Sequence, residues 1–273
     1  MKYGVCLEMF FVDRPFLERI GLAAEAGYRY AEMWFSDGTA AARGMNWDDP
    51  KRPDRVRRAA AKAGITLTNA VIGSPDGALG GGLTDAARRK EWLRRADATL
   101  EFCRAADIGA AIVCTGNAVR GLTAGRMRQN VIDGLKATAE RAERAGVTLW
   151  LEPLNDQVDH AGYFLTGSDA GADMCRAVNS PRLRLLFDCY HMQIMEGDLL
   201  GHIRRQLDVI GHFHAAGHPG RHELWLGETH YPFLVRQIEG WGYRGVFALE
   251  YLPTLAPEES LRQALTYVQT GKH

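Results

Sequence analysis

The stretch AERAGVTLWL, residues 142–151, joins a helical pattern to a buried strand through a single glycine. The amphipathic pattern ends at Gly146, and an apolar run begins at Thr148. Glycine is favoured just past the end of a helix because it adopts a left-handed conformation without a steric penalty. The same junction recurs in AEAGYRYAEM (24–33), AAKAGITLTN (60–69) and IEGWGYRGVFAL (238–249). This repetition predicts a chain in which helices and buried strands alternate.

Apolar runs of strand length recur along the whole chain, and an amphipathic stretch follows each of them. The predicted strands cover residues 3–9, 28–35, 66–72, 110–114, 148–152, 184–188, 209–214 and 245–250. The predicted helices cover residues 14–26, 53–63, 85–106, 124–145, 168–178, 198–207, 232–239 and 257–269. Strands that alternate with helices pair in parallel, and the helices cover the sheet.

The chain has 273 residues, which is close to the length of one (β/α)₈ barrel, about 250 residues. A doubly wound open sheet is the competing architecture. Eight regular units without a break in composition favour closure into a barrel. We therefore expect the α/β class and a single (β/α)₈ TIM barrel domain over residues 1–273.

Composition and charge exclude several classes of protein. The sequence is 46% hydrophobic and 24% charged, as is ordinary for a globular chain, and 33 basic side chains balance 33 acidic ones. A net charge of zero argues against nucleic acid or a membrane surface as a partner. No apolar run is long enough to span a bilayer, and the five cysteines show no C-x-x-C spacing. We expect a cytoplasmic protein with a small-molecule substrate, and barrels of this kind often form homo-oligomers.

Four ligand-type side chains fall at the ends of the last four predicted strands. They are found in LWLEP (149–153), LLFDCYH (185–191), GHFHAAG (211–217) and FALEYLP (247–253), as Glu152, Asp188, His214 and Glu250 respectively. Active sites of barrels are built at the carboxyl ends of the strands, and a buried charge without a partner is very costly. Each of these groups alone could form a salt bridge or a helix cap. Together they predict a metal site.

The donor set predicts one divalent ion. Carboxylate and imidazole ligands without thiolate suit Mn²⁺ or Mg²⁺, with Co²⁺ also possible. All nine histidines lie at or after His160, so the first four strand ends offer no imidazole. This asymmetry argues against a cluster of several metals.

Further side chains near the predicted site suit a substrate with adjacent carbonyl and hydroxyl groups. A carboxylate oxygen of Glu152 or Glu250 that does not bind the metal could transfer a proton, so these two residues are the candidate acid/base catalysts. His191 lies three residues after Asp188 on the expected strand-to-helix loop, and could turn back toward the site to donate a hydrogen bond to a substrate oxygen. Arg221 could bind a substrate carboxylate, or simply pair with a neighbouring glutamate.

Several segments carry a family resemblance: LEPLN (151–155), GYFLTGS (162–168), FDCYHMQIMEGDL (187–199), AGHPGRHELWLGETHY (216–231) and GVFALEYLP (245–253). The chain resembles the hydroxypyruvate isomerase family, within the xylose isomerase-like TIM barrels that also include the ketose 3-epimerases. The resemblance implies a divalent metal at the four strand-end residues and acid/base roles for Glu152 and Glu250. It also implies a small substrate such as hydroxypyruvate, tartronate semialdehyde or a 2-oxo-tetronate.

Where the hydroxypyruvate isomerase pattern is expected to carry glutamine, this chain has His214, the residue type of the ketose 3-epimerases. An epimerase acting on a neutral sugar is therefore the main alternative. An apurinic endonuclease and a catalytically inactive binding scaffold are further alternatives. Zero net charge counts against the endonuclease.

Overall fold

The structure is a computed structural model that describes residues 1–34, 52–73 and 82–272. These residues form a sheet in which all neighbouring strands pair in parallel, in the order β3-β2-β1-β9-β8-β7-β6-β5-β4. The strands are β1 (Lys2–Cys6), β2 (Tyr30–Glu32), β3 (Thr66–Leu67), β4 (Asn69–Ile72), β5 (Ala110–Val113), β6 (Thr148–Leu151), β7 (Leu183–Asp188), β8 (Ile210–Ala215) and β9 (Val246–Leu249).

The two edges of this sheet, β3 and β4, are successive parts of one extended segment. Thr68, which separates them, donates its backbone N–H to Ala31 and accepts the N–H of Ala110 through its carbonyl, at 2.9 and 3.0 Å. The strand predicted over residues 66–72 therefore pairs with β2 through its first half and with β5 through its second. This segment closes the sheet into a barrel and confirms the predicted fold class.

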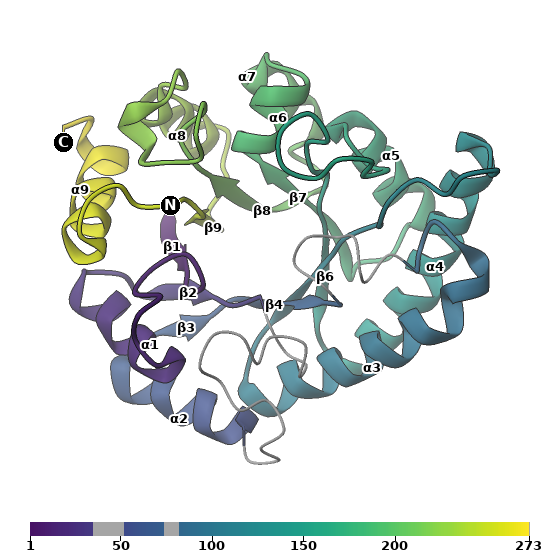
Figure 1. The fold of residues 1–273 in the computed structure, drawn as a ribbon, viewed down its shortest axis with the longest axis horizontal. Helices are drawn as coiled ribbons and strands as arrows, with labels where there is room; N and C mark the ends of the chain where they lie inside the picture. The colour runs from purple at the N-terminus through teal and green to yellow at the C-terminus, as the bar shows by residue number, and fades with distance from the viewer. Residues whose placement is uncertain (35–51, 74–81, 273) are drawn as a thin grey trace.

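Helices surround the strands on the outside of the barrel (Figure 1). They are α1 (Phe16–Glu25), α2 (Arg52–Ala63), α3 (Arg89–Ala106), α4 (Ala124–Ala145), α5 (Ser168–Val178), α6 (Cys189–Met195), α7 (Leu199–Gln206), α8 (Tyr231–Gly240) and α9 (Pro257–Thr270). Gly146 ends α4 with φ +72°, the left-handed conformation expected from the sequence. Apolar side chains of the strands and of the inward helix faces form one buried core.

The structure differs from the sequence expectations at a few places. The strand predicted over residues 28–35 is shorter, since β2 ends at Glu32, and Phe35 lies outside the described residues. The short helix α6 was not predicted, because it follows β7 without a turn and is only 7 residues long. Within the described part of the chain, no helix is long and apolar enough to cross a membrane.

Candidate active site

The four strand-end residues predicted from the sequence come together inside the barrel. One ligand atom from each lies within 4.8 Å of those of the other three, and all four side chains are buried. The residues come from four neighbouring strands: Glu152 directly follows β6, Asp188 ends β7, His214 lies near the end of β8, and Glu250 follows β9. Parallel pairing places these strand ends on one rim, so residues far apart in the chain become neighbours.

The local fold around Asp188 directs one of its oxygens toward this cluster. Oδ1 accepts the backbone N–H groups of Tyr190 and His191, at 2.7 and 3.1 Å, and so caps the start of α6. These bonds fix the carboxylate because they satisfy N–H groups that a helix leaves unpaired. The other oxygen, Oδ2, is left 3.9 Å from His214 Nδ1.

The imidazole of His214 lies at the centre of the site. Its Nδ1 is 3.3 Å from Glu152 Oε1 and 3.7 Å from Glu250 Oε2. Among the described residues neither ring nitrogen has a partner with hydrogen-bond geometry, although the side chain is only 1% exposed. A buried nitrogen that faces three carboxylates is suitably placed for a shared ligand.

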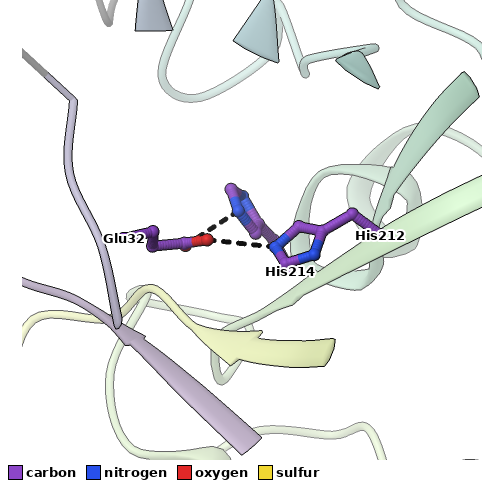
Figure 2. Close-up of side chains that lie close together, drawn as sticks. All are labelled: Glu32, His212 and His214. Carbon is purple, nitrogen blue, oxygen red and sulfur yellow. Dashed lines mark hydrogen bonds and ion pairs between the residues drawn. The ribbon is translucent and has the colours of Figure 1, made fainter. Parts of the chain in front are cut away.

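The sequence analysis missed two residues behind His214. Glu32, the last residue of β2, lies 2.9 Å from His214 Nε2, and it also accepts a 3.0 Å hydrogen bond from His212 Nε2 (Figure 2). Glu32 ends β2 in the structure but lies inside the strand predicted over residues 28–35, so a search for polar residues at predicted strand ends does not select it. His212 and His214 are two residues apart on β8, and this spacing places both on one face of the strand.

Burial sets the charge states of these groups. It raises the pKa of Asp188 to about 7, with Glu152 and Glu250 adding to the effect and His214 opposing it. Burial also raises the pKa of Glu152. Burial alone would lower the pKa of His214, but Glu32, Glu250 and Glu152 outweigh it and raise that pKa well above its usual range. The site therefore holds protons that a cation would displace.

These residues fit a divalent cation. Three carboxylates and one imidazole converge, and the donors are oxygen and nitrogen, as magnesium and manganese prefer. A cation bound here would offset the repulsion among the carboxylates, which the protein alone balances only in part through His214 and Arg221.

We expect the affinity for Mn²⁺ to fall as the pH decreases below about 7. Because the pKa of Asp188 is raised to about 7, its carboxyl group is increasingly protonated below that pH, and each proton displaced by the metal lowers the apparent affinity about tenfold per pH unit. Titration calorimetry at pH 6 and pH 7, in buffers with different ionisation enthalpies, measures both the affinity and the proton release. Equal affinities at the two pH values, with no proton release, would contradict this expectation.

Arg221 lies beside the cluster in a left-handed backbone conformation, with φ +56°. Its Nη2 donates a short hydrogen bond to Glu250 Oε2, and the guanidinium lies over the ring of Tyr190, 5.2 Å from its centroid. The sequence left open a pairing of Arg221 with Glu223. That carboxylate instead accepts hydrogen bonds from Thr254, in the loop after β9. Arg221 is thus a half-buried cation at the site itself.

His191 is held so that one ring nitrogen is free to donate. Its Nδ1 accepts the backbone N–H of Asn155 at 3.2 Å, so the ring proton lies on Nε2. Nε2 is buried, lies 3.6 Å from Asp188 Oδ2 and has no hydrogen-bond partner among the described residues. Burial, together with the positive charge of Arg221, lowers the pKa of His191 well below its usual value, which keeps the imidazole neutral.

An aromatic side chain also contacts the site. Trp34 follows β2 and donates its indole N–H to Glu250 Oε1 at 2.8 Å. Together with Arg221, which binds the other oxygen, it fixes the orientation of the Glu250 carboxylate. Sequence spacing does not reveal this contact, because the two residues are 216 positions apart.

A family model described as "Xylose isomerase-like TIM barrel" matches residues 20–270. The chain belongs to this family. It is 31% identical over 254 residues to the 2-oxo-tetronate isomerase of Cupriavidus necator, covering 92% of this chain and 93% of that protein. It is 27% identical to the hydroxypyruvate isomerase of Escherichia coli, covering 96% and 97% of the two chains. These relatives confirm the resemblance and show that the chain is an isomerase.

Solved structures show the same fold. A Brucella melitensis protein described as an AP endonuclease of family 2 has a TM-score of 0.85 and 29% identity, with 96% and 97% of the two chains covered. A D-psicose 3-epimerase from Clostridium cellulolyticum has a TM-score of 0.78, with 98% of each chain covered. Its identity is 18%, so this second similarity shows the fold alone.

Proposed function

We propose that this protein is a metal-dependent isomerase that moves a carbonyl group between adjacent carbons of a small hydroxy acid, through an enediolate. The observation that carries the proposal is the position of Arg221, a guanidinium with 15% of its side chain exposed and in direct contact with a candidate acid/base carboxylate, Glu250. A substrate that is itself a carboxylate requires such a cation. The relatives named 2-oxo-tetronate and hydroxypyruvate isomerase act on substrates of this class by their names.

The residues of the chain have distinct tasks in this reaction. Arg221 binds the substrate carboxylate, and the N–H of His191 Nε2 donates to a substrate oxygen. Glu152 or Glu250 removes the proton from the hydroxyl-bearing carbon and delivers a proton to the former carbonyl carbon, while a hydroxyl proton moves to the new hydroxyl oxygen. A divalent cation held by the four strand-end residues would polarise the carbonyl and stabilise the negative charge of the enediolate.

Burial of the two glutamates supports the proton transfer. Glu152 is 6% exposed and Glu250 is 5% exposed, so a proton removed by either is shielded from bulk water.

The test is an assay of purified, Mn²⁺-loaded protein with hydroxypyruvate, a 2-oxo-tetronate and a neutral ketohexose in D₂O. We expect isomerisation of the carboxylated substrates, with solvent deuterium appearing on the carbon that receives the proton. Turnover of the neutral ketose alone, with deuterium at C3, would replace this proposal by the epimerase that His214 suggested from the sequence. Nicking of abasic DNA in a parallel assay would favour a repair nuclease instead.

A further inference from the structure

We propose that Glu32 and His212 are positioning residues, which hold the His214 ring so that its Nδ1 faces the metal-binding carboxylates. This inference rests on the proposed metal site, since it assigns a task behind one ligand of that site. It concerns the part of the barrel interior between the ends of β2 and β8, where these three side chains meet (Figure 2).

The two nitrogens of His214 face different surroundings. Nδ1 lies 3.3 Å from Glu152 Oε1, whereas Nε2 lies 2.9 Å from Glu32 Oε1. A ligating imidazole offers a lone pair on one nitrogen and keeps a proton on the other. Glu32 has only acceptor oxygens when ionised, so it retains the proton on Nε2 and leaves Nδ1 for the cation. Without this carboxylate the ring could turn or adopt the other tautomer.

His212 in turn orients Glu32. Its Nε2 donates to Glu32 Oε2 at 3.0 Å, and the other oxygen, Oε1, lies at an ion-pair distance of 2.9 Å from His214 Nε2. The ring of His212 stacks on the indole of Trp150, with centroids 4.0 Å apart and planes at 6°. Trp150 belongs to β6 and lies two residues before Glu152. The stacking therefore links the orientation of His212 to the strand that leads to a candidate metal ligand.

His212 lies between Glu32 and the opposite end of the barrel. His212 lines a cavity of about 560 Å³ at the opposite, amino-terminal ends of the strands, together with Trp150 and Arg184. Its Nδ1 is buried and has no hydrogen-bond partner within the described part of the chain. His212 thus lies outside the four-residue cluster, and its link to that cluster is through Glu32.

The same three residues could in principle bind a second metal ion, because their ligand atoms are close together. The geometry favours a direct interaction instead, since the His212 N–H points at Glu32 with hydrogen-bond geometry. We therefore expect one Mn²⁺ per chain. Two ions bound per chain, with the second lost on Glu32→Gln, would overturn the positioning role.

The main test compares the Mn²⁺ affinity of the wild-type protein with that of Glu32→Gln. Glutamine has the same shape but no charge, and it donates toward one of the two rings. We expect the dissociation constant to rise about 10-fold to 100-fold, the usual effect of removing a partner of a metal-ligating histidine. Thr138→Val is the control, because Thr138 is buried in α4 and accepts the indole N–H of Trp92, away from the site. Equal affinities in Glu32→Gln and wild type would overturn the proposal.

Two variants of His212 separate positioning from loss of packing. His212→Phe keeps a ring that stacks on Trp150 but removes the donor to Glu32, whereas His212→Gln removes the ring and restores an N–H donor. We expect His212→Phe to weaken Mn²⁺ binding about 2-fold to 10-fold, the usual contribution of one hydrogen bond, and His212→Gln to recover part of the loss. If His212→Gln binds Mn²⁺ more weakly than His212→Phe, His212 has a packing role only, and its part of the proposal is overturned.

A spectroscopic readout does not depend on activity. In the Co²⁺-loaded protein, a coordinated imidazole gives a paramagnetically shifted N–H signal in proton NMR. We expect one such signal, from His214 Nε2, that exchanges slowly with solvent in wild type and faster in Glu32→Gln. If wild type binds neither Mn²⁺ nor Co²⁺, the proposed function fails. If wild type binds both and the N–H exchanges equally fast in the two proteins, only the positioning role fails.

Discussion

Replacing Glu152 or Glu250 with glutamine is expected to lower kcat about 10²-fold to 10⁴-fold, the usual contribution of general acid–base catalysis. Glutamine preserves the shape of each side chain but can neither accept nor return the substrate proton. Steady-state kinetics with a carboxylated substrate measures the effect, and circular dichroism and Mn²⁺ titration report whether fold and metal binding persist. Retained activity in both variants would refute the acid/base assignment.

Glu228→Gln is the matched control for these two variants. Glu228 is an exposed carboxylate that accepts a hydrogen bond from Gln193 Nε2 at 2.8 Å. It belongs to the same carboxyl-end loops but not to the four-residue cluster, so we expect kcat to stay within about twofold of wild type, as is usual for a surface substitution. A loss as large as that of Glu250→Gln would mean that charge at this face, rather than proton transfer, limits the rate.

Arg221→Met is expected to reduce kcat/KM for hydroxypyruvate about 10²-fold or more. Truncating one partner of a buried, hydrogen-bonded charge pair costs about 2 to 5 kcal/mol, and the methionine fills a similar volume without a charge. Arg221→Lys should show an intermediate loss, because lysine keeps the charge but not the two-pronged geometry.

The neutral analogue dihydroxyacetone separates the two tasks that Arg221 could have. If Arg221 binds the substrate carboxylate, its loss weakens inhibition by a carboxylated analogue and leaves inhibition by dihydroxyacetone nearly unchanged. If Arg221 only orients Glu250, through the hydrogen bond that joins them, then both inhibitors are affected alike. That second result would remove the main support for a carboxylated substrate.

The candidate metal ligands could be predicted because an apolar run and the polar residue at its end are adjacent in the sequence. An apolar run that ends in Glu152 or Asp188 indicates both a buried strand and a polar group at its carboxyl end, and parallel pairing then places successive ends on one rim. The structure brings these residues and His214 together as expected. The family resemblance added the class of reaction, which the spacing of residues alone left open.

Contacts across the barrel were not predictable in the same way. Trp34 reaches Glu250 over a separation of 216 residues, and Glu32 reaches His212 over a separation of 180 residues. Arg221 had two glutamates nearby in sequence, Glu223 and Glu228, yet its hydrogen bond is to Glu250. Sequence spacing describes neighbours along one strand or one turn, whereas these pairs depend on how the barrel closes.

The sequence by itself determined the alternation of strands and helices, the closed barrel and the four residues of the candidate metal site. These follow from short-range periodicity and from the polarity of strand ends. Only the tertiary structure decided that Thr68 joins both edges of the sheet, that Asp188 caps a helix with one oxygen, and that Glu32 supports His214. The reason is physical: closure brings strands from opposite ends of the chain within a few ångströms, and buried polar groups then pair with whichever partners that packing provides.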